Sequence, residues 1–249
     1  MIISRQNLLI KKIRALSSKK GRDNFGEYIV ESVKAVKEVL SSSHTVSLIV
    51  ATEKGLACLN GCEKDVKVEL VSEDVFNSIT TEVTPQGVMA IVKKPEYKRC
   101  DFKGSCLFLD GVSDPANVGA ILRTAASSGY NHIYLADCAD PFNPKSVRAS
   151  MGGLFKVNLT FGKREELLSL ITLPIIVADM NGENAFKFGT TFKDNFCLVI
   201  GNEANGVSEL LKNSATYTVS IPMQNGMESL NAAVSAGILM YALKSDIGE

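Results

Sequence analysis

From residue 105 onward, short apolar runs and helical patterns alternate along the chain. The helical segment Asn117 to Ser128 should end at Gly129, a residue that tolerates a left-handed backbone. The alternation predicts an α/β fold with a mostly parallel sheet and helices on both of its faces. The expected strands are Cys106 to Leu109, His132 to Leu135, Ile175 to Ala178, Cys197 to Ile200 and Thr218 to Ile221.

The first hundred residues follow the pattern of a small α/β domain. Asn7 to Leu16 and Tyr28 to Leu40 carry apolar residues at helical spacing, and Ser72 to Ile79 should form a short helix capped by Ser72. A charged segment that contains Pro95 then follows, as is typical of a linker. We expect a first domain over residues 1–96, a linker over 97–104 and a second domain over 105–249. Strands are expected at Val46 to Ala51, Lys67 to Val71 and Val88 to Val92.

Composition excludes several classes of protein. A chain of 249 residues, 45% hydrophobic and 22% charged, is long enough for two modest globular domains. Its apolar stretches are too short or too interrupted to cross a bilayer, and Arg5, Gln6 and Asn7 interrupt the start where a secretory signal needs an apolar run. We therefore expect a cytoplasmic protein with no membrane association.

Other common kinds of site find no support in the sequence. No G-x-G-x-x-G motif follows the first strand of the second domain, and no Walker A loop is present. His44 and His132 are far apart and have no obvious nucleophile partner. The cysteines do not complete a tetrahedral metal site, so we expect reduced structural thiols and no metal. They are Cys58, Cys62, Cys100, Cys106, Cys138 and Cys197.

Basic residues gather at the start of a chain whose net charge is zero. Residues 1–22 contain no Asp or Glu, so the remaining chain is net acidic. Such a basic end can follow the phosphates of a nucleic acid, although a solvated helix face has the same composition. The candidate RNA-binding residues are Arg5, Lys11, Lys12, Arg14, Lys19, Lys20 and Arg22.

Three short segments should lie where open α/β sheets bind ligands, near residues 200–206, 221–223 and 229–231. Gly201 follows the strand Phe196 to Ile200, so it either serves an ordinary turn or lets a flat ring approach the backbone. Pro222 either ends a strand or forms a rigid wall that recognises adenine. Ser229 should lie in the first turn of a helix from about Glu228 to Leu243, where it can cap the helix or help bind an anion. Small residues in this last helix, with apolar residues around its axis, indicate a buried and closely packed helix.

Arg123 should lie off the buried face of its helix if Val118, Ile121 and Leu122 face the core. It can then reach a substrate or another chain, although an exposed arginine on a helix can also be merely solvated. Asn117, six residues earlier, lies about 9 Å away along the helix axis. It can cap the helix, contact the substrate, or do both.

Taken in order, these segments resemble the three motifs of the SpoU (TrmH-like) branch of the SPOUT RNA methyltransferases. The first is Asn117 to Ala125, the second Gly201-Asn202-Glu203, and the third Ile221-Pro222-Met223 with Ser229-Leu230-Asn231. Ser4 to Glu31 and Thr84 to Val88 also look like the family's substrate-binding domain, so the resemblance covers nearly the whole chain. It implies methyl transfer from S-adenosylmethionine (AdoMet) to a ribose 2′-hydroxyl of RNA.

The resemblance also implies features that the residue pattern alone does not predict. These are a deep trefoil knot in the second domain and a homodimer, with Arg123 working beside the donor bound by the other subunit. Ser150 and Gly152 should shape a nearby loop. The residues carried over are Gly201, Ile221, Met223 and Leu230 for the donor pocket, and Asn117, Arg123, Glu203, Ser229 and Asn231 for catalysis or substrate positioning.

Two positions depart from the family pattern. Asn225 stands where the third motif usually has glycine, although asparagine also tolerates a left-handed backbone and Gly226 follows. Ser32 stands where many relatives have glycine after the glutamate that matches Glu31. The first change bears on the loop that contacts the donor or ribose, and the second on the match in the substrate-binding domain.

The leading interpretation is a 2′-O-ribose methyltransferase of ribosomal RNA. Transfer RNA is the close alternative substrate, and a catalytically silent RNA-binding or ribosome-assembly protein and a base-nitrogen methyltransferase are the competing classes. Arginine stays protonated near neutrality, so Arg123 should clamp a phosphate and stabilise the developing oxyanion rather than act as a base. Glu203, Ser229 and Asn231 should then orient the donor and the ribose.

Overall fold

The protein, described by a computed structural model over residues 1–63, 65–96 and 103–244, folds into two compact units. The first unit contains Met1–Glu96 together with Asp140–Phe155, and the second contains Tyr97–Ala139 and Lys156–Glu249. Most of the linker expected at 97–104 lies outside the described residues. Residues 140–155, although they follow the start of the second unit in sequence, pack within the first.

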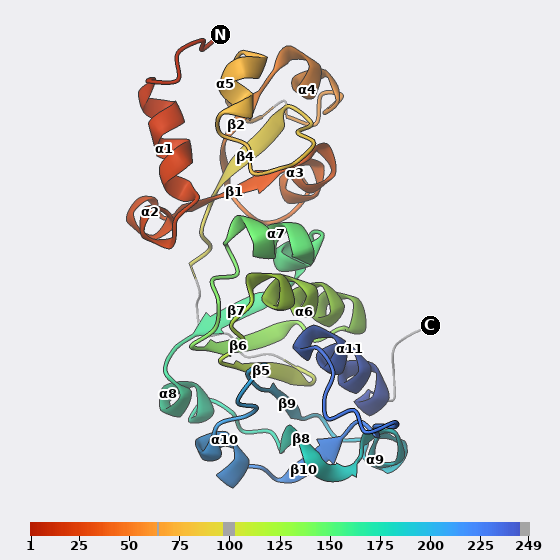
Figure 1. Ribbon diagram of the computed structural model, residues 1–249. Helices are drawn as coiled ribbons and strands as arrows, with labels where there is room; N and C mark the ends of the chain where they lie inside the picture. The colour runs from red at the N-terminus through yellow and green to blue at the C-terminus, as the bar shows by residue number, and fades with distance from the viewer. Residues whose placement is uncertain (64, 97–102, 245–249) are drawn as a thin grey trace. The chain divides into compact units, whose positions relative to one another are not determined.

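A mixed sheet lies at the centre of the first unit (Figure 1). Its order is β1-β4-β2-β3, with β4 antiparallel to β1 and β2, and with β3 parallel to β2. The elements of this unit are α1 (Leu8–Leu16), α2 (Lys19–Phe25), β1 (Glu27–Glu31), α3 (Val33–Leu40), β2 (Val46–Ala51), α4 (Glu53–Ala57), β3 (Val68–Leu70), α5 (Glu73–Asn77), β4 (Val88–Lys93) and α7 (Pro144–Ser150), which is followed by the 3-10 helix η1 (Gly153–Lys156).

The segment Tyr28 to Leu40 is not one helix, as its apolar spacing suggested. It forms the end of β1 and then α3, because Ser32 adopts φ 91° and its side chain accepts a hydrogen bond from Ala35 N at 3.3 Å. The consecutive apolar residues 28–30 are buried in the sheet, and such short runs fit a strand as well as a helix. The cap expected for α5 is confirmed, since Ser72 accepts a hydrogen bond from Val75 N. Asn7 caps α1 in the same way by accepting from Leu9 N.

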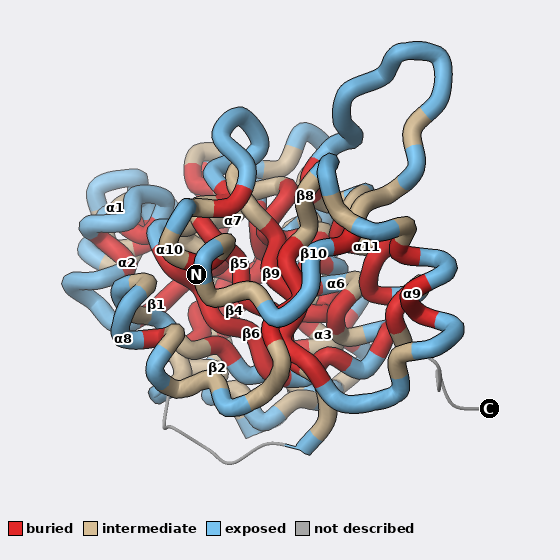
Figure 2. Tube along the Cα trace, turned by 90° about the horizontal axis from the view of Figure 1, so that it is seen from below, coloured by how far each residue is buried: buried red, intermediate tan, exposed pale blue. Residues whose placement is uncertain are grey.

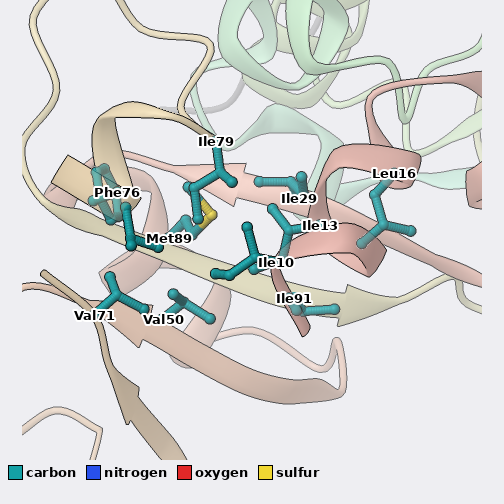
Figure 3. Close-up of a cluster of buried hydrophobic side chains, with 11 residues drawn as sticks. Ile10, Ile13, Leu16, Ile29, Val50, Val71, Phe76, Ile79, Met89 and Ile91 are labelled. Atoms are coloured by element: carbon teal, nitrogen blue, oxygen red, sulfur yellow. The ribbon is translucent and has the colours of Figure 1, made fainter. Parts of the chain in front are cut away.

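The core of the first unit forms where α1 packs on the sheet (Figure 3). Ile10, Ile13 and Leu16 are fully buried at helical spacing on α1. They meet side chains of the sheet such as Ile29 and Ile91, which are paired across β1 and β4. Burying apolar side chains of this size contributes about 1.5–3 kcal/mol each, so α1 is an integral part of the unit.

The second unit is built on a six-stranded sheet in the order β10-β8-β9-β5-β6-β7, and every paired strand is parallel. This confirms the expected α/β fold. β7 was not predicted, because it is a short edge strand in which only Leu159 is buried. The elements are β5 (Cys106–Asp110), α6 (Pro115–Ser128), β6 (His132–Ala136), β7 (Asn158–Phe161), α8 (Arg164–Leu168), β8 (Ile175–Asn184), α9 (Ala185–Thr191), β9 (Cys197–Ile200), α10 (Glu209–Asn213), β10 (Tyr217–Ser220) and α11 (Ala232–Leu243).

Helices cover both faces of this sheet. Phe108 and Val199 pack with Leu167 of α8 and Leu211 of α10 on one face. Side chains alternate between the two faces along each strand, and the residues of β5, β6 and β9 that point to the opposite face are buried too. These three strands are therefore buried along their length (Figure 2). On the opposite face α6 and α11 lie side by side (Figure 1).

The two helices of this pair differ from expectation at their starts. α6 begins at Pro115 with Asp114 as its cap, and it ends at Gly129 with φ 77°, as predicted. α11 begins at Ala232 instead of near Glu228, because the side chain of Asn231 accepts hydrogen bonds from the N–H groups of the first turn. Ser229 and Leu230 therefore lie before the helix, and capping belongs to Asn231.

Only one side of α11 is buried within the chain. Ala236, Leu239 and Met240 are buried, whereas Val234 and Tyr241 are 50% and 45% exposed. Gly237 lies against α6, since a Cβ placed on it would be 3.6 Å from Thr124 Cγ2. The close packing expected of this helix is present on that side, and an apolar surface is left on the other.

Candidate functional site

One hydrogen-bonded network joins three segments that are far apart in the sequence. Asn117, in the first turn of α6, donates from Nδ2 to Glu203 Oε1 at 2.8 Å. Asn231, the cap of α11, donates from Nδ2 to Asn117 Oδ1 at 2.9 Å. The structure therefore brings together three of the predicted site residues, one from each motif.

The partners of each amide fix its orientation. Asn231 Oδ1 accepts from Ala233 N at 2.9 Å and Val234 N at 3.3 Å, so its NH₂ group faces Asn117. Asn117 in turn presents its oxygen to Asn231 and its NH₂ group to Glu203. Each NH₂ group has two hydrogens, and the network uses one of each. A second N–H donor remains on both amides for a substrate.

The Glu203 carboxylate anchors the network at the start of α6. It accepts hydrogen bonds from Ser113 N at 3.0 Å, Ser113 Oγ at 2.9 Å and Asp114 N at 3.3 Å, besides that from Asn117. Partial burial alone would raise the pKa of Glu203, but the donors from Asn117 and the backbone outweigh it and lower the pKa to about 2. Glu203 is thus an anion at neutral pH and a poor proton acceptor.

The loop after β9 holds Glu203 in a tight turn. Asn202 and Gly206 exchange two backbone hydrogen bonds of 2.9 and 3.0 Å, and Asn202 Nδ2 donates to Gly111 O at 2.7 Å. A Cβ placed on Gly201 would lie 2.3 Å from the carbonyl carbon of Gly206. Of the two interpretations of Gly201, the turn is therefore the one that this geometry requires.

A buried carboxylate next to this loop was missed by the sequence analysis. Asp110, 1% exposed at the end of β5, accepts from Arg164 Nε at 2.5 Å and from Ser208 N at 2.7 Å. Arg164 also pairs with Asp137. The available signal was an acidic residue at the carboxyl end of a buried strand. Asp110 ties the loops after β5, β6 and β9 together, so its role is to hold their shape.

The third motif forms an irregular, mostly exposed segment between β10 and α11. Ile221 and Met223 are half-buried at its start, and Leu230 is 38% exposed at its end. Asn225 has φ 56° and Gly226 has φ 71°, so asparagine does keep the left-handed turn at the position where glycine is usual. Ser229 is exposed, and no hydrogen bond connects it to another described residue. The structure does not bring Ser229 into the network.

Arg123 stands apart from the network in its own chain. It is exposed, and it forms no hydrogen bond or ion pair with any residue that the structure describes. Six residues of helix place it about 9 Å along the axis from Asn117 and roughly 120° around it. Within this chain, Arg123 therefore faces away from the amides and the carboxylate that the fold assembles.

The basic residues at the start of the chain fall into groups with different surroundings. Lys11, Lys19 and Lys20 are exposed and form no ion pair within the described part of the chain. Arg14 donates to Ser78 Oγ at 2.9 Å. The other two side chains on the surface are paired with carboxylates, Arg5 with Asp74 at 2.6 Å and Lys12 with Glu27 at 2.5 Å.

Arg22 cannot contact RNA, contrary to the prediction. It is 1% exposed, and its guanidinium is bonded to Asp140 at 2.8 Å and to the carbonyl oxygens of Leu16 and Ser17 at 2.9 and 2.8 Å. Its carboxylate partner lies 118 residues further along the chain. A pattern of basic residues near the start of the sequence could not reveal this pair.

Two further predicted residues lie at the end of α7 and just after it. Ser150 is buried and donates to Val147 O at 2.7 Å, which closes the last turn of the helix. Gly152 has φ 84°, and the Glu38 carboxylate occupies the space that a Cβ would take, 2.0 Å from its position. Both residues shape the turn after α7, as expected, and this turn belongs to the first unit.

Both histidines are at least partly buried, whereas the described cysteines range from the buried Cys106 and Cys197 to the exposed Cys58 and Cys62. Burial lowers the pKa of His44, which contacts Tyr28 Oη at 3.0 Å, and that of His132, which contacts Thr160 Oγ1 at 3.1 Å. The described cysteines are all free thiols, and Cys100 lies outside the described residues. Residues 1–63, 65–96 and 103–244 contain no group of three His, Cys, Asp or Glu side chains placed to hold a metal ion. Over the same ranges, no helix is long and apolar enough to cross a membrane.

Both parts of the chain match known families. The family model described as "SpoU rRNA Methylase family" matches residues 104–241. The one described as "MRM3-like substrate binding domain" matches residues 7–90. Together they cover all three motifs and every basic residue of the candidate set except Arg5.

Individual relatives agree with these matches. The 23S rRNA (guanosine(2553)-2'-O)-methyltransferase RlmP of Bacillus subtilis is 30% identical over 98% of this chain and 98% of its own length. The 23S rRNA (adenosine(1067)-2'-O)-methyltransferase of Streptomyces laurentii is 33% identical over 74% of this chain and 72% of its own. The crystal structure of an AdoMet-bound rRNA methyltransferase from Sinorhizobium meliloti has a TM-score of 0.87 and 26% identity, and covers 100% of this chain and 98% of the other.

Proposed function

The chain belongs to the SpoU rRNA methylase family, and on that basis we propose that it transfers a methyl group from AdoMet to the 2′-hydroxyl of a ribose in ribosomal RNA. The observation that carries the proposal is the network of Glu203, Asn117 and Asn231. It joins all three motif segments and leaves amide N–H donors free. The relatives compared above act, by their names, on 23S ribosomal RNA.

The residues at the third motif suit the donor. Ile221, Met223 and Leu230 offer apolar side chains to an adenine ring, and Pro222 has no N–H and cannot be part of a strand ladder beyond β10. Gly201 keeps the neighbouring loop tight. When bound, AdoMet supplies a methyl group that its sulfonium has already activated. The chain therefore has to bind the donor, orient the ribose and help the hydroxyl lose its proton.

Asn117 and Asn231 are the residues that we assign to orienting the ribose. Their fixed amides offer directed N–H donors. Glu203 positions Asn117 and, with a pKa of about 2, does not accept the hydroxyl proton. Ser229 is exposed and lies before α11, and we propose that it helps to position the substrate.

Arg123 is the residue that we propose to act on the RNA itself. Its guanidinium can clamp a phosphate in a bidentate manner and stabilise the oxyanion that forms as the hydroxyl is deprotonated. Since it faces away from the network of its own chain, we propose that it completes the site of a second subunit. The exposed apolar side of α11, with Val234 and Tyr241, supports a homodimer through the α6 and α11 surface.

Three further points of the proposal rest on the family and on composition. We propose that the second unit contains the family's trefoil knot and that the enzyme works in the cytoplasm. We also propose that residues 1–96 form the substrate-binding domain, with a connection at 97–104 and the catalytic domain over 105–249. The match of residues 7–90 to a substrate-binding family model supports this division.

The proposal is tested by incubating the protein with AdoMet that carries a labelled methyl group and with separated ribosomal and transfer RNA from an unmodified source. We expect label in ribosomal RNA, recovered after digestion as a 2′-O-methyl nucleoside. Label in transfer RNA would show that transfer RNA is the substrate. Label on a base would show that the enzyme methylates a base nitrogen and not a ribose. Failure to bind AdoMet would overturn the proposal that the protein is an enzyme and would favour a catalytically silent RNA-binding protein.

A further inference from the structure

The first unit contains a cavity of about 170 Å³ that none of the functions above uses. Its walls come from the end of β1 and the start of α3, from residues 81–86 before β4, and from α7 with Met151. An apolar cavity of roughly 150 Å³ accepts a benzene molecule, so this one is large enough to receive a flat aromatic ring. All of its lining residues belong to the first unit.

The charges around this cavity do not favour a phosphate. Glu31, Glu38 and Glu82 line it together with only two cations, Lys34 and Arg148. Burial raises the pKa of Glu31, but even with that residue neutral the two remaining carboxylates balance the cations. Phosphate sites have an excess of positive charge. A neutral ligand group fits the cavity better than the RNA backbone does.

Most polar groups in the walls already have hydrogen-bond partners within the chain. The remaining ones are available to bind a ligand. Glu31 accepts hydrogen bonds from Thr80 and Thr81, and Glu82 is paired with Arg148 at 2.8 Å. Glu38 forms no hydrogen bond or ion pair with any residue in the described ranges, and its carboxylate lies against the turn at Gly152. A carboxylate without donors is an acceptor for two N–H groups of a ligand.

Two kinds of side chain complete the cavity. Gln86 accepts a hydrogen bond from Val33 N at 2.7 Å, so its oxygen is used and its NH₂ group can donate to a ligand. Ile29 and Val147 are buried apolar lining, and Met151 is 47% exposed. The thioether of a methionine makes favourable contacts with aromatic rings, and apolar side chains contribute by being buried against them. The lining thus combines ring contacts with a free acceptor and a free donor.

We propose that this cavity binds an unpaired nucleobase of the RNA substrate, and that guanine is the base it fits best. Guanine presents N1–H and an exocyclic N2–H₂ side by side, which match the two oxygens of Glu38, and its O6 matches the amide of Gln86. Proteins read single-stranded RNA by such contacts to the edges of unstacked bases. The proposal rests on the proposed function, because it assigns part of the RNA specificity to the first unit.

The test measures base preference without AdoMet, using the full-length protein. Fluorescence anisotropy gives the affinity for short RNA strands of about eleven nucleotides, composed of uridine alone or of uridine with one central guanosine, adenosine or cytidine. Glu38→Gln removes one acceptor with little change in shape, and Ala35→Met fills the cavity from α3. Glu53→Gln is the matched control, since Glu53 is exposed on α4 and lies outside the cavity.

We expect the wild-type protein to bind the guanosine strand about tenfold more tightly than the uridine strand, which corresponds to roughly 1.4 kcal/mol. Glu38→Gln and Ala35→Met should remove that preference and keep the affinity for uridine, while Glu53→Gln should keep both. Equal affinity for all four strands, or a guanosine preference that survives Glu38→Gln, would overturn the base site. AdoMet binding, measured on the same samples, reports separately on the proposed function.

Discussion

Two arginines on helices of this protein occupy opposite environments. Arg22, on α2 of the first unit, is 1% exposed and is held by Asp140 and by two backbone carbonyl oxygens. Arg123, on α6 of the second unit, is exposed and has no partner among the described residues of its own chain. The fold surrounds the first guanidinium with acceptors and leaves the second, a permanent cation, without one among the described residues.

This difference separates residues that hold the fold from residues available to a substrate. A buried guanidinium is retained only where its hydrogen bonds are made, because desolvating a charge without partners is very costly. An exposed guanidinium pays no such penalty, so its position is free to serve recognition. The comparison predicts that loss of Arg22 damages stability and that loss of Arg123 damages activity.

The largest effect is expected for Arg22→Ala. Removing one partner of a buried ion pair costs about 3–5 kcal/mol, because the carboxylate of Asp140 is left desolvated without its cation. Urea unfolding should therefore show a large fall in the free energy of unfolding, whereas Lys20→Ala, on the exposed side of the same helix, should change it by less than about 0.5 kcal/mol. Equal stability of the two variants would show that the Arg22 pair contributes nothing.

Arg123→Ala should have the next largest effect, and on a different quantity. Loss of a group that stabilises a transition-state oxyanion typically lowers kcat by a factor of about 100 to 1000, or roughly 2.7–4 kcal/mol. Unfolding free energy and AdoMet affinity should stay near the wild-type values, because the side chain is exposed and makes no contact in the chain. Arg123→Lys keeps the charge but not the bidentate geometry, and it should recover only part of the rate. A wild-type kcat in Arg123→Ala would remove this residue from the mechanism.

A smaller effect is expected for Glu203→Gln, because Glu203 is hydrogen-bonded, as Arg22 is, but is also accessible to solvent, as Arg123 is. The carboxylate is partly exposed, so after solvent screening the loss of its charged hydrogen bonds should cost about 1–2 kcal/mol. Its folded pKa of about 2 lies below the unfolded value, so the stabilisation is full above the unfolded pKa of 4.5 and is lost as the pH falls towards 2.

The matching measurement is the free energy of unfolding of both proteins from pH 7 to pH 2. The gap between wild type and Glu203→Gln should narrow below about pH 4.5 and nearly close at pH 2. A gap that stays constant with pH would mean that the charge of Glu203 does not stabilise the network.

The smallest effects should come from the exposed lysines of the first unit. Lys11→Ala, Lys19→Ala and Lys20→Ala should each weaken RNA binding without selecting a sequence, and each should reduce the salt slope of log K by about 0.7 for a single strand. Stability should not change, since none of these side chains has an ion-pair partner among the described residues. A variant that combines the three substitutions should show the largest reduction. If its salt slope equals that of the wild type, these lysines do not contact the RNA phosphates.

Local signals were sufficient for much of the fold. Gly129 marked the end of α6, Ser72 marked the start of α5, and the apolar runs located β2, β3 and β4 of the first sheet and five strands of the second. They failed where two patterns fit one segment. Residues 28–40 have helical spacing, yet the turn at Ser32 and the pairing of β1 with β4 make the first part a strand.

The site was predictable only in part, for a related reason. The order of the motifs identified Asn117, Glu203 and Asn231, and the fold joins them. Long-range partners carried no local signal. Asp140 lies 118 residues from Arg22, and the burial of Asp110 beneath the loops follows from three strands ending together. Residues whose role depends on tertiary pairing could not be assigned from the sequence.

The measurement that most directly tests the central claim is methyl transfer by a mixed dimer of one Arg123→Ala subunit and one Asn231→Ala subunit, purified with two different tags. If Arg123 serves the partner's network, one of the two sites has both wild-type residues, and the dimer should retain about half of the wild-type kcat while each homodimer is nearly inactive. If Arg123 acts within its own chain, both sites are damaged. A mixed dimer as inactive as the homodimers would contradict the account.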